Sequence, residues 1–435
     1  MKYIKDSFFT IGTRFLLVII GLFSSIVLAR LLGPIGRGQW AQLLLPVTLM
    51  FRVLVFGLPT AQIYCANKLN FNKKQVFSNV LSLIAIFSII SIPIYLFGIR
   101  YLYEMFFSST EYRLIKLACI LVPVEIALLV LSNTFLINRG INSFNLLQLL
   151  RPVVFIILLL TAIFLIEIDV HMILTIYMIS LFIIFLVMIY MLLKAKYSFS
   201  LSLNFKVVKS LLRYGLKDHL GQIFIILNER IDLWIISYFL NISQVGIYTI
   251  ALVATKLVQI PDAIGMNLFP VMTIEEQDRG GVLSQKVLRI SIAISVLMIL
   301  PLFLVAKPVI NFLYGNEFLT AVIPFVILLP LTFTNSVGKI CRAYLSGNGL
   351  PQIASFASGV SLVVSIFFGI VFIKRWGIVG AALTATTSST IYAGIMFIWF
   401  IKVSNHSVLS SLIVKPEDLR QLFREGAGLW KKLVS

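Results

Sequence analysis

Twelve apolar stretches, each long enough to cross a bilayer, make up most of this chain, six on each side of a short basic segment. A hydrocarbon core needs about 20 apolar residues per helix. The first six stretches cover residues 8–29, 40–66, 76–99, 114–137, 145–166 and 171–193. The second six cover residues 211–240, 246–271, 287–306, 318–345, 352–373 and 377–401. Charged residues form only 12% of the chain, whereas soluble domains carry roughly a quarter. We therefore predict an all-α polytopic membrane protein of about 12 transmembrane helices.

Short connections leave no room for a separate soluble domain. We expect an N-terminal lobe over residues 1–194, a cytoplasmic linker over 195–210 and a C-terminal lobe over 211–403. The remaining tail, 404–435, combines apolar and basic residues. An amphipathic surface helix over 415–435 is one interpretation of it, and a floppy basic tail is the other.

The net charge of +19 is unevenly distributed along the chain. With the N-terminus inside, and with cations toward the ends of spans counted with the adjoining connections, 24 of the 36 lysines and arginines fall on the inner side, 8 on the outer side and 4 deep within spans. Positive residues favour the cytoplasmic side, so we predict that both termini are cytoplasmic. This distribution explains the charge without nucleic-acid binding. The three cysteines and three histidines are scattered, which argues against a disulfide framework or a metal site.

The second half of the chain repeats the first at an offset of 208 residues. Gly38 falls on Gly246, and Trp40 falls on Tyr248. The same offset aligns Gly57 with Gly265, and residues 138–142 with residues 346–350. Because each copy has an even number of spans, both copies enter the membrane from the same side, as parallel repeats do. Two copies of one membrane unit usually enclose a pathway, which favours a transporter.

Several segments resemble one family of transporters. Residues 28–38 (LARLLGPIGRG), which include Arg30, Gly33 and Gly38, look like the turn between helices 1 and 2 of bacterial O-antigen and capsule flippases. Similar segments in the second half are residues 228–232 (NERID), 245–251 (VGIYTIA), 346–351 (SGNGLP) and 377–382 (GIVGAA). These flippases belong to the multidrug/oligosaccharidyl-lipid/polysaccharide exporter superfamily. The resemblance implies a V-shaped pair of lobes around a central cavity, which moves an undecaprenyl-diphosphate-linked glycan to the outer leaflet.

Four cations within the predicted spans are candidates for binding this substrate: Arg14, Arg52, Arg230 and Lys256. A charge near the bilayer centre costs at least about 2.5–3.5 kcal/mol, so it usually faces a cavity or a partner. Shifted by 208 residues, Lys256 falls one helical turn from Arg52, which predicts a cationic chamber suited to a diphosphate. The family resemblance implies the same role for Arg14, Arg52 and Lys256. The alternative is that each cation pairs with a neighbouring acid.

Acidic residues form a second candidate group. Asp218, Glu229 and Asp232 follow three- and four-residue steps in the predicted span 211–240, together with Gln222, and Asp262 lies in the next span. These carboxylates could bind a coupling proton or sodium ion, or balance the cations of the cavity. Structural pairing is the alternative. Glu125, within the span 114–137, is a further candidate.

We predict a flippase without enzymatic activity or cofactor, whose partners are the lipid-linked glycan, the bilayer and polysaccharide assembly proteins. No GxxxxGK[ST] loop occurs, so ATP is not expected as the energy source. The location expected for it is the bacterial cytoplasmic membrane. Two alternatives remain open: an ion-coupled small-molecule antiporter of the same superfamily, and a membrane polysaccharide polymerase or ligase. The longest outer connection, residues 100–113, has two acids and no histidine, which argues against the enzyme.

Overall fold

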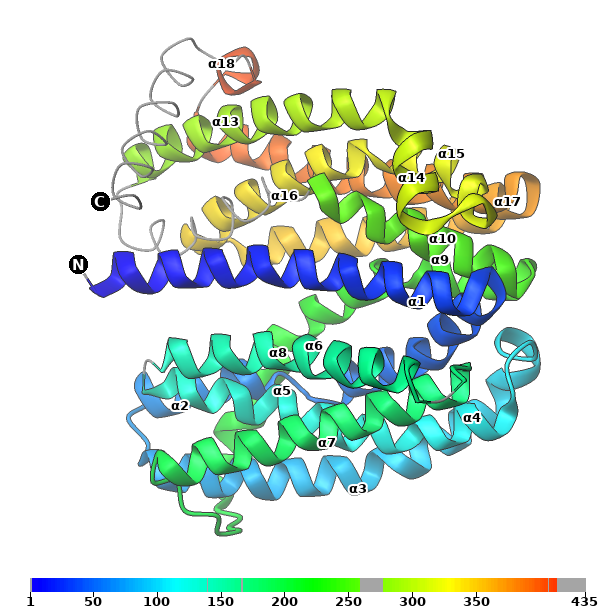
Figure 1. The fold of residues 1–435 in the computed structure, drawn as a ribbon. Helices are drawn as coiled ribbons and strands as arrows, with labels where there is room; N and C mark the ends of the chain where they lie inside the picture. The colour runs from blue at the N-terminus through cyan, green and yellow to red at the C-terminus, as the bar shows by residue number, and fades with distance from the viewer. Residues whose placement is uncertain (1, 139, 166, 259–276, 406, 413–435) are drawn as a thin grey trace, which may run out of the picture. The chain divides into compact units, whose positions relative to one another are not determined.

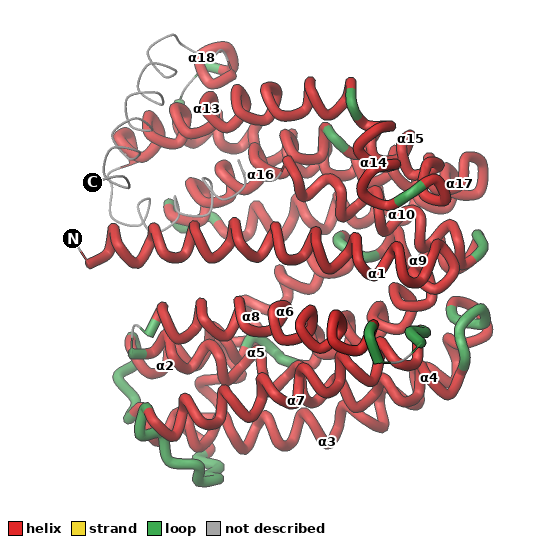
Figure 2. The backbone as a smooth tube through the Cα atoms, viewed as in Figure 1, coloured by secondary structure: helices red, strands yellow, loops and turns green. Residues whose placement is uncertain are grey.

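The computed structural model describes residues 2–138, 140–165, 167–258, 277–405 and 407–412. Every regular element in this part of the chain is a helix (Figure 2). Inter-residue contacts divide the chain into two compact units, Met1–Ile250 and Ala251–Ser435. The lobe boundaries expected from the sequence, with a linker at 195–210, stay a prediction.

The first unit is a bundle in which α3, α5, α6 and α7 run alongside one another (Figure 1). Its helices are α1 (Lys2–Leu54), α2 (Leu58–Asn67), α3 (Lys73–Phe106), α4 (Tyr112–Leu117), η1 (Ala118–Ile120), α5 (Leu121–Ile137), α6 (Ile141–Ile163), α7 (Val170–Lys194), α8 (Phe205–Asn228), α9 (Ile231–Phe239) and α10 (Ile242–Ala254), whose last residues belong to the second unit. Long helices are expected because backbone polar groups in lipid must be satisfied within their own segment.

The second unit contains a helical bundle in which α16 packs against α13 and α17. Its helices are η2 (Thr255–Val258), α13 (Gln277–Leu304), α14 (Ala306–Tyr314), η3 (Asn316–Ala321), α15 (Val322–Leu328), α16 (Pro330–Gly347), α17 (Pro351–Ser404) and α18 (Val408–Leu412). Tyr344 of α16 and Phe400 of α17 meet edge to face, 5.1 Å between ring centroids, within a core of buried apolar residues.

Two helices contain a sharp reversal at a glycine. In α1, Gly33 has φ 62° and ψ −174°, and Pro34 then begins the second arm. Proline suits this position because its fixed φ is helical and its missing N–H is not needed there. In α17 the break is Gly377, with φ 56°. The sequence predicted both turns, but the first is a single residue and not the ten-residue connection implied by the spans 8–29 and 40–66.

The two arms of α17 pack closely on each other. Ser361 Oγ donates to the carbonyl of Ser388 at 3.0 Å. A Cβ placed on Gly380 would lie 2.0 Å from the carbonyl oxygen of Phe372. The absence of a side chain at Gly380 therefore permits this close approach of the two arms.

Seven helices of the described chain are long and apolar enough to span a membrane, or eight if the bent pair Asn316–Leu328 and Pro330–Gly347 is one span. Both α1 and α17 carry two of the expected spans, so the count of twelve stays a prediction. Large apolar side chains lie on the outside, among them Ile89, Phe164, Leu304 and Phe312, which are 72–87% exposed. Such surfaces suit lipid and not water. The expected tail helix at 415–435 lies outside the described residues.

The segment between α7 and α8 is extended and bonded to α3. Ser202 N donates to Ser82 Oγ at 2.9 Å, and Ser82 Oγ donates back to the Ser202 carbonyl, also at 2.9 Å. Asn204 N donates to Asn79 Oδ1 at 2.7 Å. Asn204 also caps α8, since its side chain accepts from the backbone of Lys206 and Val207. This cap starts α8 at Phe205, six residues before the expected span.

Candidate functional site

A break between α1 and α2 creates one corner of the candidate site. Phe56 and Gly57 have φ values of 43° and 67°, in the left-handed region, which ends α1 directly after Arg52 and its neighbours. Gly57 packs against Gly215 of α8, where a Cβ on Gly57 would lie 2.3 Å from the Gly215 carbonyl oxygen. The backbone contact fixes this corner against α8.

His219 of α8 completes the corner. Its Nε2 lies 2.7 Å from the carbonyl oxygen of Val53, in the last turn of α1. The imidazole ring also packs on Phe56, with 5.8 Å between centroids. A helix end leaves carbonyls without intrahelical partners. His219 therefore supplies a hydrogen-bond partner for the Val53 carbonyl, which the break of the helix leaves without one.

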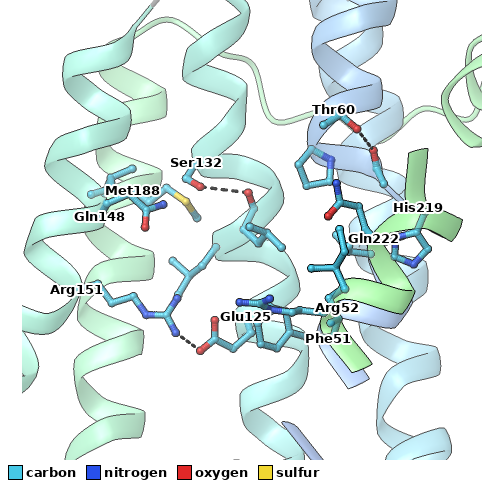
Figure 3. A pocket seen from close by; sticks show the side chains of 18 of the residues that line it. Phe51, Arg52, Thr60, Glu125, Ser132, Gln148, Arg151, Met188, His219 and Gln222 are labelled. Atoms are coloured by element: carbon cyan, nitrogen blue, oxygen red, sulfur yellow. Dashed lines mark hydrogen bonds and ion pairs between the residues drawn. The ribbon is translucent and has the colours of Figure 1, made fainter. Parts of the chain in front are cut away.

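A cavity of about 420 Å³ opens beside this corner, lined by α1, α2, α5, α6, α7 and α8 (Figure 3). Its charged lining residues are Arg52, Glu125, Arg151 and Glu229. Its uncharged polar lining residues are Thr60, Ser132, Gln148, His219 and Gln222. Figure 3 shows Gln148 and Arg151 on one wall and Gln222 and His219 on the other. The size and the mixture of apolar and convergent polar groups are those of a small-ligand site.

The first of two ion pairs in the cavity joins Arg52 to Glu229. Arg52 Nη1 lies 3.2 Å from Glu229 Oε2, and the two side chains are 39% and 52% exposed. Exposed pairs of this kind are worth about 0–1 kcal/mol. Arg52 can therefore exchange Glu229 for another anion at little cost.

In the second ion pair the carboxylate is buried, while the arginine side chain is 35% exposed to the cavity side of the structure. Arg151 Nη2 bonds Glu125 Oε1, whose side chain is 4% exposed. Tyr177 donates its O–H to the same oxygen at 3.1 Å, and its hydroxyl accepts from Arg151 at 3.0 Å. Trp40 holds the Tyr177 ring edge to face at 5.5 Å. Glu125 and Arg151 of this cluster line the cavity, and they are a fixed part of its wall, since removal of one partner from a buried pair costs about 3–5 kcal/mol.

Of the four predicted cations, only Arg52 is among the residues that line this cavity. Arg14 is exposed on α1, and Arg230 sits half-buried at the break between α8 and α9. Lys256 is exposed in η2 of the second unit. The chamber formed jointly by Arg52 and Lys256 stays a prediction.

The predicted acidic stripe is divided by the same break at Glu229 and Arg230. Glu229 lines the cavity together with Gln222. Asp232 is buried elsewhere and accepts hydrogen bonds from Tyr248 O–H and Leu233 N, each at 2.7 Å. The expectation of one continuous helix over 211–240 is therefore wrong, because non-helical backbone at Arg230 turns Asp232 off the stripe. Asp262 lies outside the described residues, as does the side chain of Asp218.

The three turn residues predicted from the sequence lie at or near the reversal in α1. Gly33 makes the reversal in α1, Gly38 packs against α10, and Arg30 is exposed just before the turn.

Sequence reasoning missed Arg151, Gln148, His219 and Tyr177. Arg151 was assigned to the inner side in the count of positive charges, yet it lies in the middle of α6. The sequence did contain a signal for Arg151, which falls six residues inside the predicted span 145–166. Glu125 lies in another span, and a carboxylate there requires a partner of opposite charge.

The sequence of this chain is similar to those of several known proteins. Residues 27–323 match the model of the family described as "Polysaccharide biosynthesis protein". The chain is 27% identical over 190 residues to the "Probable low-salt glycan biosynthesis flippase Agl15" of Haloferax volcanii, a segment that covers 42% of this chain and 40% of that protein. It is also 27% identical over 218 residues to an uncharacterized membrane protein of Methanocaldococcus jannaschii, covering 42% of it. The matches thus span less than half the length of either curated relative.

Solved structures give the fold. An inward-facing multidrug resistance MATE family transporter of the MOP superfamily superposes with a TM-score of 0.73 at 15% identity, covering 89% of this chain and 95% of that one. The lipid II flippase MurJ in an inward closed conformation gives 0.74 at 13% identity, covering 90% and 89%. These likenesses confirm the predicted polytopic all-α fold. Because the family model matches well over half of this chain, the chain belongs to the polysaccharide biosynthesis protein family.

Proposed function

We propose that this protein is a flippase that moves an undecaprenyl-diphosphate-linked oligosaccharide from the inner to the outer leaflet, for surface polysaccharide such as O-antigen or capsule. In a bacterium it would act in the cytoplasmic membrane, with both termini in the cytoplasm. It works by alternating access of two lobes and has no catalytic activity. The observation that carries the proposal is a polar, charged cavity of about 420 Å³ among membrane-spanning helices of a polysaccharide biosynthesis protein.

The Arg52–Glu229 pair suits the diphosphate of such a substrate. Arg52 is held by a half-exposed carboxylate whose loss costs little. A guanidinium binds phosphate oxygens through paired donors. In the proposed cycle Glu229 balances Arg52 while the cavity is empty and releases it when the diphosphate enters. Arg14, Arg230 and Lys256 would extend the cationic path.

A flipping assay tests the proposal. The purified chain is reconstituted in proteoliposomes that carry a fluorescent undecaprenyl-diphosphate-linked oligosaccharide, and a membrane-impermeant quencher reports its leaflet. We expect transfer by the wild-type protein and a loss of at least about tenfold in Arg52→Ala, since a charge-assisted hydrogen bond is worth about 1.5–3 kcal/mol. Arg100→Ala, an exposed residue of α3 outside the cavity, is the matched control.

Three outcomes would count against the proposal. Wild-type vesicles that leave the lipid in its original leaflet would reject a flippase. Transport of a small cationic dye in place of the lipid would favour the antiporter. Unimpaired transfer by Arg52→Ala would reject the binding role of Arg52.

A further inference from the structure

We propose that the Glu125–Arg151 side of the cavity is a subsite for an uncharged sugar, which binds the first saccharide units of the cargo through their hydroxyl groups. The inference rests on the proposed function, and it assigns the sugar and the diphosphate to different side chains. Glu125 and Arg151 would hold the sugar, while Arg52 would hold the diphosphate.

The first observation is an acceptor without a donor. Glu125 is 3% exposed and lines the cavity. Its Oε1 is bonded to Arg151 and Tyr177, whereas its Oε2 is buried and has no hydrogen-bond partner among the described residues. A buried polar atom left without a partner costs about 1–3 kcal/mol. The terminal torsion of a glutamate is broad, so a small rotation presents this oxygen to a ligand in the cavity.

The second observation is the supply of neutral donors and acceptors beside it. Gln148 lies one helical turn before Arg151 on α6, and Gln222 lines the opposite wall (Figure 3). In the described part of the chain, neither amide makes a hydrogen bond. Each amide offers two N–H donors and a carbonyl acceptor. Sugar hydroxyls both donate and accept, and this set of groups matches them.

Charge selects the sugar over the other ligands that the cavity could hold. A diphosphate has acceptors only, so it cannot donate to Glu125 Oε2 and is repelled by the carboxylate. A metal cation is repelled by the guanidinium of Arg151, which already holds this carboxylate. Among the described residues, no group of three or more His, Cys, Asp or Glu side chains could hold a metal ion. An uncharged polyhydroxyl ligand meets neither repulsion.

Apolar residues complete the subsite. Leu128 and Leu129 of α5 and Met188 of α7 line the cavity beside the polar cluster. A pyranose ring has C–H faces as well as hydroxyls, and these apolar side chains can cover them. Because Tyr177 and Trp40 hold the cluster in place, the subsite should discriminate between sugars that differ in one hydroxyl.

Saturation-transfer NMR tests the subsite on the full-length protein in lipid nanodiscs. The probes are methyl glycosides of the common hexoses and N-acetylhexosamines, added one at a time, with inorganic pyrophosphate and sodium chloride as competitors. We expect at least one glycoside to bind, and neither pyrophosphate nor sodium ion to displace it. Gln148→Leu and Glu125→Gln should weaken binding about tenfold or more. The matched controls are Gln75→Leu and Glu104→Gln, which lie outside the cavity lining.

The outcomes separate the subsite from the proposed function. The absence of binding by every glycoside, displacement by pyrophosphate or by sodium ion, or unchanged binding in Gln148→Leu would overturn the subsite. Gln148→Leu removes no ion pair, so it keeps the test decisive if Glu125→Gln does not fold. Lipid transfer in proteoliposomes without glycoside binding would refute the subsite alone. Glycoside binding without lipid transfer would refute the flippase.

Discussion

Gly38 and Gly246, which the 208-residue repeat aligns, lie directly against each other. A Cβ on Gly38 would lie 2.0 Å from the carbonyl oxygen of Ile242, and a Cβ on Gly246 would lie 2.0 Å from the carbonyl oxygen of Pro34. Each carbonyl belongs to the residue four positions before the other glycine. The contact is therefore reciprocal, as in an interface where the same surface patch meets itself.

Alanine at either glycine should destabilise the protein. A Cβ at 2.0 Å from a carbonyl oxygen forces α1 and α10 apart, and overpacking costs about 1–3 kcal/mol or more. We expect Gly38→Ala and Gly246→Ala to lower the apparent Tm and the yield of monodisperse protein in detergent. The reciprocity predicts similar losses at the two sites.

Gly98 of α3 provides the control for this pair. Nothing lies within 4 Å of a Cβ placed there. Because glycine is a poor helix former by about 0.5–1 kcal/mol relative to alanine, Gly98→Ala should hold or raise the Tm. Equal Tm values for Gly38→Ala and Gly98→Ala would show that the close contact does not exist.

The sequence predicted the parts of the fold that depend on local chemistry. Apolar runs indicated the long helices, and the Gly33–Pro34 and Gly377 positions indicated the reversals in α1 and α17. Breaks within predicted spans were different. Non-helical backbone at Phe56 and Arg230 has no glycine or proline at the residue itself. The break at Phe56 has a local signal in the next residue, Gly57, whose φ is 67°, but its place also depends on the contacts of Gly57 with Gly215 and of His219 with Val53, which no local pattern reveals.

The site was predicted only in part, for the same reason. Burial cost identified Arg52 and Glu229 one at a time, as charges in apolar spans. Their contact joins residues 177 positions apart, and it depends on where α1 and α8 end. Arg151 was missed because a positive charge near a predicted boundary was taken for a loop residue. The repeat indicated the Gly38–Gly246 correspondence but not the contact between the two residues.

The two ion pairs of the cavity should differ in their effect on stability. Arg151→Met strands the buried carboxylate of Glu125, and removal of one partner of a buried pair costs up to about 3–5 kcal/mol. Arg52→Met disrupts a half-exposed pair and should cost about 1 kcal/mol or less. Thermal unfolding followed by intrinsic fluorescence compares the two. Glu125→Gln added to Arg151→Met removes the stranded charge and should recover part of the loss, whereas a further drop in Tm would contradict the pairing.

Tyr248→Phe should destabilise the protein without impairing lipid transfer. Tyr248 is fully buried and donates to Asp232 Oδ2 at 2.7 Å. Without the hydroxyl, Asp232 loses its side-chain donor and keeps backbone donors, among them Leu233 N, and the loss is expected to be about 1–3 kcal/mol. Because neither residue lines the cavity, initial rates of flipping per folded protein should stay near the wild-type value. A rate loss at unchanged Tm would instead place Asp232 in the transport cycle.

Exchange of the charges at Arg52 and Glu229 separates substrate binding from simple pairing. In the wild-type protein Arg52 Nη1 and Glu229 Oε2 lie 3.2 Å apart. The double variant Arg52→Glu with Glu229→Arg restores an ion pair between the same two positions. Its free energy of unfolding should match that of the wild type to within the value of an exposed pair, about 1 kcal/mol. If Arg52 binds the diphosphate, a carboxylate at position 52 repels the substrate, and flipping should stay as low as in Arg52→Ala. Full activity in the exchanged protein would mean that the pair holds α1 and α8 together and that the diphosphate is bound elsewhere.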